Sequence, residues 1–265
     1  MIDLHCHILP GVDDGAKNLE ESLEMARIAE SEGIKKIINT SHYHPEFEYI
    51  MGDSLLSEVQ KFNKILKENN IDIEVFIGNE LYYSDNLLEY IENKDFYTLN
   101  NSRYLLIEFS PTSFPKNIGD IVYELKIRGY IPILAHVERY RAVHENINLI
   151  KNAIKEGALI QINASSLTSK GPKEFERVCN DLIKQNMVHF VATDAHSSTR
   201  RRPLIKDAYD VVCSKYGESL ANNLFNLNAQ KVLNNEEIIV KIKNISKKEK
   251  RSLISKLFGR KNKFM

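Results

Sequence analysis

The first fourteen residues contain two histidines and three aspartates around a Pro-Gly turn, in the stretch MIDLHCHILPGVDD. His5 and His7 are two residues apart, and on a β-strand this spacing directs both side chains to the same face, while Cys6 points to the other. Two imidazoles side by side at the end of a strand suit a metal ion better than a hydrophobic core. The N-terminus is therefore the first candidate for metal-binding chemistry.

Polar side chains also follow each of the other predicted strands. These residues are His42, Glu80, Glu108, His136, Asn163, Asp194 and His196. The carboxyl ends of the strands of a parallel barrel open on one face, so we expect these side chains to converge with His5 and His7. Mixed histidine and carboxylate ligands suit Mn, Fe or Zn, and their number predicts two or three ions. Clustered divalent ions are typical of phosphate-ester hydrolysis. Only for Asn163 is a turn residue bonded to backbone the favoured interpretation.

The elements that must position these side chains are short apolar segments alternating with helical patterns. The predicted strands are Ile2–His5, Lys36–Thr40, Ile73–Ile77, Tyr104–Glu108, Ile131–Ala135, Leu159–Ile162 and His189–Thr193. The predicted helices are Leu19–Glu32, Ser54–Asn69, Asp85–Asn93, Ile118–Arg128, Asn146–Glu156 and Lys173–Gln185, followed by an all-helical region from about Pro203 to Leu233. Seven repeated strand–helix units without a glycine-rich nucleotide motif favour a barrel of parallel strands.

Composition narrows the class of protein further. The 265 residues include 36 basic and 36 acidic ones, but residues 241–265 contain ten Lys or Arg and one acid, whereas residues 1–240 contain 26 basic and 35 acidic residues. The acidic body argues against nucleic-acid binding. Three scattered cysteines do not form a disulfide framework, and none has an arginine six residues on, as a cysteine phosphatase requires. Without an apparent signal peptide or membrane span, a cytoplasmic location is predicted.

Six stretches of the chain resemble one superfamily. They are DLHCHILPGVDDG, TSHYHP, GNELYY, LIEFS, AHVERY and TDAHSSTRRRP. This set is similar to the PHP (polymerase and histidinol phosphatase) superfamily, and more narrowly to bacterial protein-tyrosine phosphatases of the CpsB/YwqE type. The resemblance implies an α/β fold, a distorted (β/α)7 barrel of PHP type with an all-helical C-terminal portion. It covers a metallophosphatase domain at residues 1–235 and leaves residues 236–265 as a basic tail, part amphipathic helix or disordered.

The resemblance also implies a three-metal site. His5, His7, Glu80 and Asp194 correspond to the ligands of one ion, Glu80 would bridge to a second ion held by Glu108 and His136, and Asp14, His42 and His196 would hold the third. Arg139 and Arg201 correspond to phosphate-binding arginines of the family, with Arg200 and Arg202 adjacent to Arg201 as alternatives. Two or three Mn ions are implied, with Fe, Zn, Mg or Co as alternatives.

The implied activity is hydrolysis of phosphotyrosine on a bacterial tyrosine kinase that regulates capsular or exopolysaccharide synthesis. Two rival functions are a phosphatase for a small metabolite such as histidinol phosphate, and a non-catalytic kinase adaptor. The basic tail, with apolar residues among its cations, is a candidate for docking to a kinase or for peripheral membrane contact.

Three questions stay open at this point. Asp13 is the alternative to Asp14 as a ligand. The family usually reads T-P-H-H where this chain has Thr-Ser-His-Tyr-His at residues 40–44, so His44 is a candidate to assist or replace His42. Four aromatic residues flank the predicted ligands, and either core packing or a wall around a substrate ring would explain them: Tyr82, Tyr83, Phe109 and Tyr140.

Overall fold

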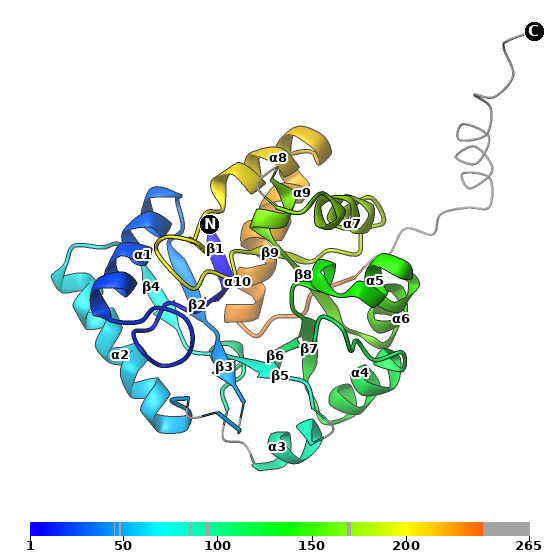
Figure 1. Ribbon diagram of the computed structural model, residues 1–265, viewed down its shortest axis with the longest axis horizontal. Coiled ribbons are helices and arrows are strands. Elements are labelled where there is room, and N and C mark those ends of the chain that lie inside the picture. The colour runs from blue at the N-terminus through cyan, green and yellow to red at the C-terminus, as the bar shows by residue number, and fades with distance from the viewer. Residues whose placement is uncertain (45, 48, 85, 94–95, 169–170, 241–265) are drawn as a thin grey trace, which may run out of the picture.

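The computed structural model describes residues 1–44, 46–47, 49–84, 86–93, 96–168 and 171–240 (Figure 1). Most of the predicted tail, residues 241–265, lies outside this range, and the predicted domain boundary at residue 235 stays a prediction. No helix within the described residues is long and apolar enough to cross a bilayer.

The strands surround a central axis and all pair in parallel (Figure 1). They are β1 (Ile2–Cys6), β2 (Lys36–Asn39), β3 (Ser41–Tyr43), β4 (Glu74–Phe76), β5 (Asn79–Tyr82), β6 (Tyr104–Glu108), β7 (Ile131–Leu134), β8 (Leu159–Asn163) and β9 (Phe190–Ala192). They form two sheets, one in the order β1-β2-β4 and one in the order β3-β5-β6-β7-β8-β9. The predicted barrel of parallel strands is confirmed.

Two of the seven predicted strands, Lys36–Thr40 and Ile73–Ile77, are each followed directly by a further short strand that the sequence did not predict. The chain leaves β2 at Thr40 and continues as β3, and it leaves β4 at Ile77 and Gly78 and continues as β5, so each pair changes from one sheet to the other. The barrel closes on its other side between β1 and β9. There His7 N donates to Ala195 O at 2.8 Å and Asp194 N donates to His5 O at 2.8 Å. The result is a distorted ring of seven units.

Helices cover the outside of the strands (Figure 1). They are α1 (Leu19–Ser31), α2 (Gly52–Glu68), α3 (Leu87–Asn93), α4 (Ile118–Ile127), α5 (Arg141–Glu145), α6 (Asn148–Glu156), α7 (Lys173–Lys184), α8 (Lys206–Tyr216), α9 (Glu218–Asn222) and α10 (Asn228–Leu233). Short 3₁₀ turns occur at Leu99–Asn101, Val137–Arg139 and Ala164–Leu167, and a π-helical turn at Asn223–Leu227. The all-helical C-terminal portion is confirmed, as is the predicted cap of α1, where the Asn18 side chain accepts from Glu21 N at 3.0 Å.

The inside of the barrel is apolar at one end and polar at the other. On β6, alternate residues on one face are Tyr104 and Leu106, which belong to the interior apolar cluster, and then Glu108. Residues of α10 pack into the same cluster, so this helix closes the apolar end of the barrel. Since side chains alternate along a strand, this pattern places the polar residues at the carboxyl ends.

Strand β1 departs from simple alternation. Ile2 and Leu4 belong to the interior apolar cluster, and the next interior positions are His5 and His7 rather than Cys6. The pairing of β1 with β2 shifts register between Asp3 and Cys6. Such a bulge re-aims the side chains that follow it. It lets one short strand contribute both to the core and to the polar end.

Candidate metal centre

The most deeply buried group of candidate ligands joins β1 to the ends of strands far along the chain. His5, His7, Glu80 and Asp194 are each at most 2% exposed, and one ligand atom from each lies within 4.8 Å of the others. His5 Nε2 is 3.1 Å from Glu80 Oε2 and 3.3 Å from His7 Nε2. The sequence predicted these four residues as one group, and the structure brings them together.

A second group shares Glu80. His42 Nδ1 lies 3.4 Å from Glu80 Oε2 and 3.1 Å from Glu108 Oε1. His136 Nε2 is 3.0 Å from Glu80 Oε1 and 3.7 Å from Glu108 Oε2. Glu80, Glu108 and His136 therefore meet as predicted, but His42 lies against the same carboxylates, an arrangement that the sequence prediction did not include.

A third group lies on the solvent side of the first. It contains His7, Asp14, His42 and His196. Asp14 Oδ1 is 3.3 Å from His42 Nε2 and 3.5 Å from His196 Nε2. The prediction named Asp14, His42 and His196 but not His7, which the structure places in both the first and the third group. His42 likewise joins two groups, one through each ring nitrogen.

The donor atoms fit divalent cations. Ring nitrogens and carboxylate oxygens converge, and His196 Nε2 is buried with no hydrogen-bond partner in the part of the chain that the structure describes. Although burial lowers the pKa of His42, hydrogen bonds to Asp14 and Glu108 and the nearby carboxylate charges raise it to about 12. Burial also lowers the pKa of His7, but the Asp13 carboxylate raises it to about 9. The carboxylates thus attract positive charge strongly, which a metal ion supplies as well as a proton does.

Asp13 positions ligands rather than joining a group. Its Oδ2 accepts from His7 Nδ1 at 2.7 Å and from His42 N at 2.9 Å, and its Oδ1 accepts from Gly15 N at 2.9 Å. Binding of Nδ1–H by a carboxylate leaves His7 Nε2 free for an ion. The structure therefore favours Asp14 over Asp13 as the ligand. Gly15 permits this packing, because a Cβ atom there would lie 2.4 Å from His7 O.

We expect Asp13→Asn to weaken Mn²⁺ binding by about 10–100-fold, the usual cost of removing a carboxylate that orients a metal-bound histidine. The amide keeps one acceptor but presents an N–H group where His42 N or Gly15 N now donates. The measurement is a Mn²⁺ titration by calorimetry. Asp72→Asn is the matched control, because Asp72 is exposed and its carboxylate forms a surface ion pair with Lys35. Unchanged affinity in a folded Asp13→Asn protein would contradict a positioning role.

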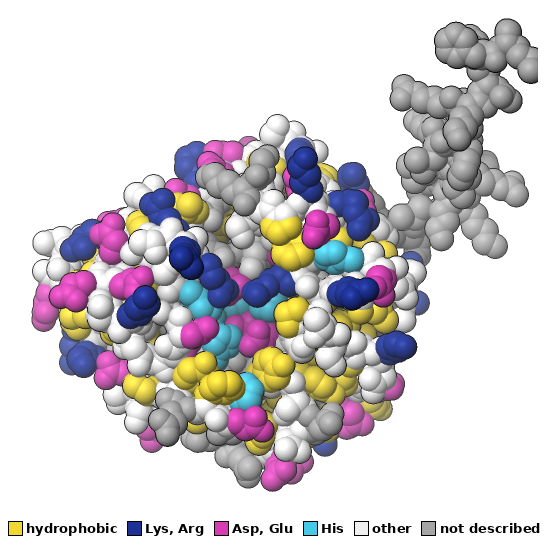
Figure 2. All heavy atoms as spheres, viewed as in Figure 1, with side chains coloured by type: hydrophobic (Ala, Val, Ile, Leu, Met, Phe, Trp, Pro, Cys, Tyr) yellow, Lys and Arg dark blue, Asp and Glu magenta, His cyan; other side chains and the backbone are white. Residues whose placement is uncertain are grey.

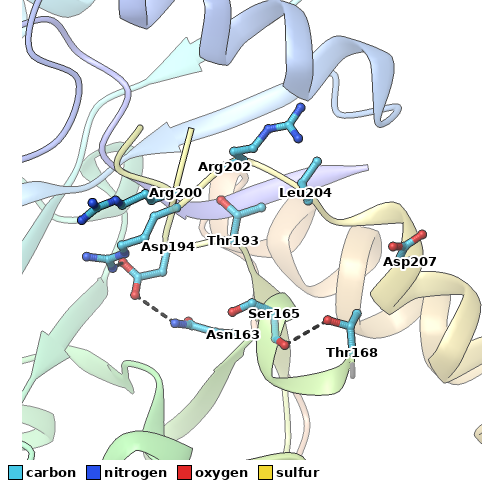
Figure 3. A pocket seen from close by; sticks show the side chains of 10 residues that line it. Asn163, Ser165, Thr168, Thr193, Asp194, Arg200, Arg202, Leu204 and Asp207 are labelled. Carbon is cyan, nitrogen blue, oxygen red and sulfur yellow. Dashed lines mark hydrogen bonds and ion pairs between the residues drawn. The ribbon is translucent and has the colours of Figure 1, made fainter. Parts of the chain in front are cut away.

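Two amide side chains, those of Gln161 and Asn163, support the predicted ligands from below. Gln161 Oε1 accepts from His136 N at 2.7 Å, and Gln161 Nε2 donates to Asn163 Oδ1 at 2.8 Å. Asn163 Nδ2 then donates to Asp194 Oδ2 at 2.9 Å (Figure 3). The interpretation of Asn163 as a turn residue bonded to backbone was wrong, since its side chain holds a predicted ligand. Gln161 was missed, although its place two residues before Asn163 puts it on the same face of β8.

Two predicted ligands have backbone dihedrals that are uncommon outside glycine. The φ angles of His136 and Asp194 are 31° and 53°. Left-handed conformations of non-glycine residues are costly and cluster at functional sites. Here they redirect the chain at the ends of β7 and β9, so that these side chains reach the shared pocket.

Arg139 and Arg201 both contact Asp194. Arg139 Nη1 donates to Asp194 Oδ2 at 3.1 Å, and Arg201 Nη2 lies 2.5 Å from Asp194 Oδ1. A cavity of about 210 Å³ opens beside them, with Arg200 and Arg202 on its wall. Figure 3 shows the Arg202 side chain projecting away from Asp194. Among the three consecutive arginines, Arg201 is thus the one paired with the cluster, and its role in phosphate binding stays a prediction.

Figure 2 shows this end of the barrel as a hollow in which acidic and histidine side chains are visible, with Lys and Arg side chains along its upper edge and hydrophobic ones along its lower edge. His44 does not belong to any of the three groups found among the described residues. Its ring packs against Phe47 and Tyr82, at 4.5 and 4.9 Å between ring centroids. The alternative that His44 replaces His42 is therefore wrong.

The proposed aromatic wall is only partly correct. Phe109 and Tyr140 are at most 1% exposed, and Tyr140 Oη donates to Ala135 O within the barrel wall. Tyr83 packs on Phe109, with 4.9 Å between ring centroids. These three rings therefore pack in or against the hydrophobic core. Of the four predicted aromatic residues, Tyr82 alone lines a depression at the site. Phe47 and Tyr49 line the same depression and were not predicted.

Comparisons with known proteins agree with this geometry. A sequence profile described as "Capsular polysaccharide synthesis, CpsB/CapC" matches residues 1–234. The tyrosine-protein phosphatase CpsB of Streptococcus agalactiae serotype V is 34% identical over 243 residues, covering 90% of this chain and 100% of that protein. A solved structure described as YwqE from Bacillus subtilis and CpsB from Streptococcus pneumoniae, "unique metal-dependent tyrosine phosphatases", superposes with a TM-score of 0.87 at 34% identity, covering 91% of this chain and 97% of the other.

A more distant solved structure shows the fold alone. It is the histidinol phosphate phosphatase of Lactococcus lactis, with zinc, L-histidinol and phosphate bound. Its TM-score is 0.54 at 14% identity, and the match covers 84% of this chain and 94% of the other.

Proposed function

The chain belongs to the CpsB/CapC family, and we propose that it is a metal-dependent protein-tyrosine phosphatase acting at the three-group site. The observation that carries the proposal is the convergence of imidazole and carboxylate donors with two arginines. The nine proposed metal ligands are His5, His7, Asp14, His42, Glu80, Glu108, His136, Asp194 and His196.

We propose Mn as the metal, with His5, His7, Glu80 and Asp194 holding one ion, Glu80, Glu108 and His136 a second, and Asp14, His42 and His196 a third. When bound, such ions lower the pKa of water toward neutrality and polarise phosphoryl oxygens. Mixed nitrogen and oxygen donors suit Mn, Fe or Zn better than Mg or Ca. Asp13 and Gln161 fix the orientation of His7 and the backbone of His136 through the hydrogen bonds described above.

Arg139 and Arg201 bind the phosphate in this proposal. Their guanidinium groups lie on the two carboxylate oxygens of Asp194, so their remaining N–H groups are held next to the clusters. Planar guanidinium groups match phosphate oxygens well. The leaving group needs little help, because a tyrosine phenol has a pKa of about 10 and departs as phenolate without a dedicated acid.

Cys6 lies between two proposed ligands but is not expected to act as a nucleophile. Cys6 is buried, and burial raises the pKa of its thiol well above the ordinary value. Its Sγ atom lies 3.8 Å from Ala195 O, in the wall between β1 and β9. A thiol held in this state is a poor nucleophile.

We propose that the substrate is phosphotyrosine on a bacterial tyrosine kinase that regulates capsular or exopolysaccharide synthesis. Support comes from the family's description and from the printed name of the streptococcal relative. The cytoplasmic location stays a prediction. The docking role of the basic tail and its contact with membranes also stay predictions, because residues 241–265 lie outside the described part of the chain.

The test is phosphate release by the Mn-loaded protein from a phosphotyrosyl peptide and from histidinol phosphate. We expect kcat/KM for the peptide to exceed that for histidinol phosphate by at least about 100-fold, which corresponds to about 2.7 kcal/mol of transition-state discrimination. Preference for histidinol phosphate would favour the metabolite phosphatase instead. Failure to hydrolyse either compound, combined with retention of a kinase in a pull-down, would favour the adaptor.

A further inference from the structure

A groove of about 500 Å³ leaves the metal centre on the side opposite the arginines. Its lining consists of His42, His44, Glu46, Phe47, Tyr49, Tyr82 and Glu108. His42 and Glu108 are both proposed metal ligands and lie close together beside Glu80, so the groove and the metal centre share a wall. Hydrophobic side chains along the lower edge of the hollow are visible in Figure 2.

The aromatic rings of this groove form a connected surface. Phe47 and Tyr49 stack with 5.4 Å between their centroids and 11° between their planes, and Tyr49 stacks on His42 at 6.1 Å. His44 links Phe47 to Tyr82. A cluster of aromatic rings that begins at a proposed metal ligand is suited to hold a ring attached to a phosphate, by stacking or by edge-to-face contact.

Phe47 is the least expected member of this surface. Its side chain is 52% exposed, although phenylalanine is a core residue by preference. The turn that presents it is fixed at both ends, because Phe47 N donates to His44 O at 2.9 Å and Ile50 N donates to Val12 O at 3.0 Å. An exposed aromatic side chain on an anchored turn beside a reactive centre is typical of a binding surface rather than of core packing.

The two sides of the centre differ in charge, and this difference decides which part of a substrate each side fits. The cavity beside Asp194 is lined by three arginines (Arg200, Arg201 and Arg202) against two carboxylates (Asp194 and Asp207), so basic groups predominate there. The groove instead carries the carboxylates of Glu46 and Glu108 among its rings, so it repels anions and accepts an uncharged ring.

We propose that the groove formed by Phe47, Tyr49 and Tyr82 binds the phenyl ring of the substrate and makes the site selective for aryl over alkyl phosphates. This inference rests on the proposed function, because it names what that site selects. The phosphate lies at the metal centre between Arg139 and Arg201, and the ring extends over His42 onto Phe47.

The experiment compares Phe47→Ala with the unaltered chain on phenyl phosphate and on an alkyl phosphate, both Mn-loaded. We expect kcat/KM for phenyl phosphate to fall about tenfold, mostly through KM, and that for the alkyl phosphate to change less than about twofold. Each ratio compares two proteins on one substrate, so differences between leaving groups cancel. Phe47→Tyr should retain the aryl preference. Tyr123→Ala is the matched control, because Tyr123 is equally exposed, at 53%, and lies on α4.

Calorimetry of phenylphosphonate and methylphosphonate separates this inference from the proposed function. We expect the unaltered chain to bind phenylphosphonate about tenfold more tightly and Phe47→Ala to lose that preference. If the protein hydrolyses no phosphate ester yet keeps the phenyl preference through Phe47, the proposed function fails and the groove assignment stands. If Phe47→Ala affects aryl and alkyl compounds equally, or phenylphosphonate is not preferred, the groove assignment is overturned.

Discussion

Replacing Glu80 by glutamine is expected to lower kcat for phosphotyrosine hydrolysis by about 10³-fold or more, equivalent to about 4 kcal/mol of transition-state stabilisation. Glu80 is the residue on which the site depends most. Its carboxylate lies within 3.5 Å of ring nitrogens of His5, His7, His42 and His136, and the side chain is 1% exposed.

The size of the effect follows from charge. An amide has nearly the same shape as the carboxylate, but its NH₂ end carries no lone pair with which to ligate a cation. It also removes the negative charge shared by two of the proposed ion sites. We therefore expect Glu80→Gln to bind fewer Mn²⁺ ions per chain, as counted by elemental analysis, as well as to lose activity.

The control for Glu80→Gln is Glu124→Gln, which alters a half-exposed pair with Arg128 on α4. It should keep full activity and the full number of ions. A Glu80→Gln protein with the same ion content and more than about a tenth of the original kcat would contradict the assignment of Glu80 as a bridging ligand.

Removal of metal by a chelator is expected to abolish phosphatase activity, with recovery when Mn²⁺ is added back in excess. Thiol alkylation should leave activity unchanged, because two of the three cysteines are buried and none lies in the proposed ligand groups. Activity that survives chelation but is lost on alkylation would contradict the metal mechanism. Phosphate release is measured in both cases.

The affinity for Mn²⁺ should also depend on pH, and the protonation of His7 and His42 determines whether it rises or falls. The pKa of His7 is raised to about 9 and that of His42 to about 12, so the metal-free protein holds protons on both at pH 7. An ion must displace these protons, and its apparent affinity therefore rises with pH and falls in acid. Calorimetry in two buffers of different ionisation enthalpy should show proton release on Mn²⁺ binding. An affinity independent of pH between 6 and 8 would contradict this interpretation.

The sequence was sufficient for the parts of the fold that follow from repetition. Apolar segments such as Tyr104–Glu108 and Leu159–Asn163 alternate with helices, and their polar final residues reach one end of the barrel because parallel strands share a direction. The breaks at Thr40 and Gly78 were not predictable in this way. Each follows an apolar run without any proline, and the change of partner sheet there depends on tertiary packing.

The same distinction between repeated pattern and tertiary packing holds for the residues of the site. Ligands at strand ends, such as Glu108 and Asp194, follow from register, whereas residues on loops depend on the path of the loop. Asp13 and Asp14 are adjacent in the sequence, and only the hydrogen bonds of Asp13 to His7 and His42 separate their roles. Phe47 was missed because a single aromatic residue in a polar loop carries no periodic signal.

The closure of the barrel between β1 and β9 has a consequence for biosynthesis. His5 and His7 are synthesised well before residues 194 and 195, whose backbone groups pair with them and whose Asp194 carboxylate lies 3.5 Å from His5 Nε2. The nascent polypeptide therefore carries a first strand that can pair with β2 but keeps its other edge open until β9 and the residues after it have emerged. The proposed ligand groups that include Asp194 and His196 are therefore complete only after β9 has been synthesised.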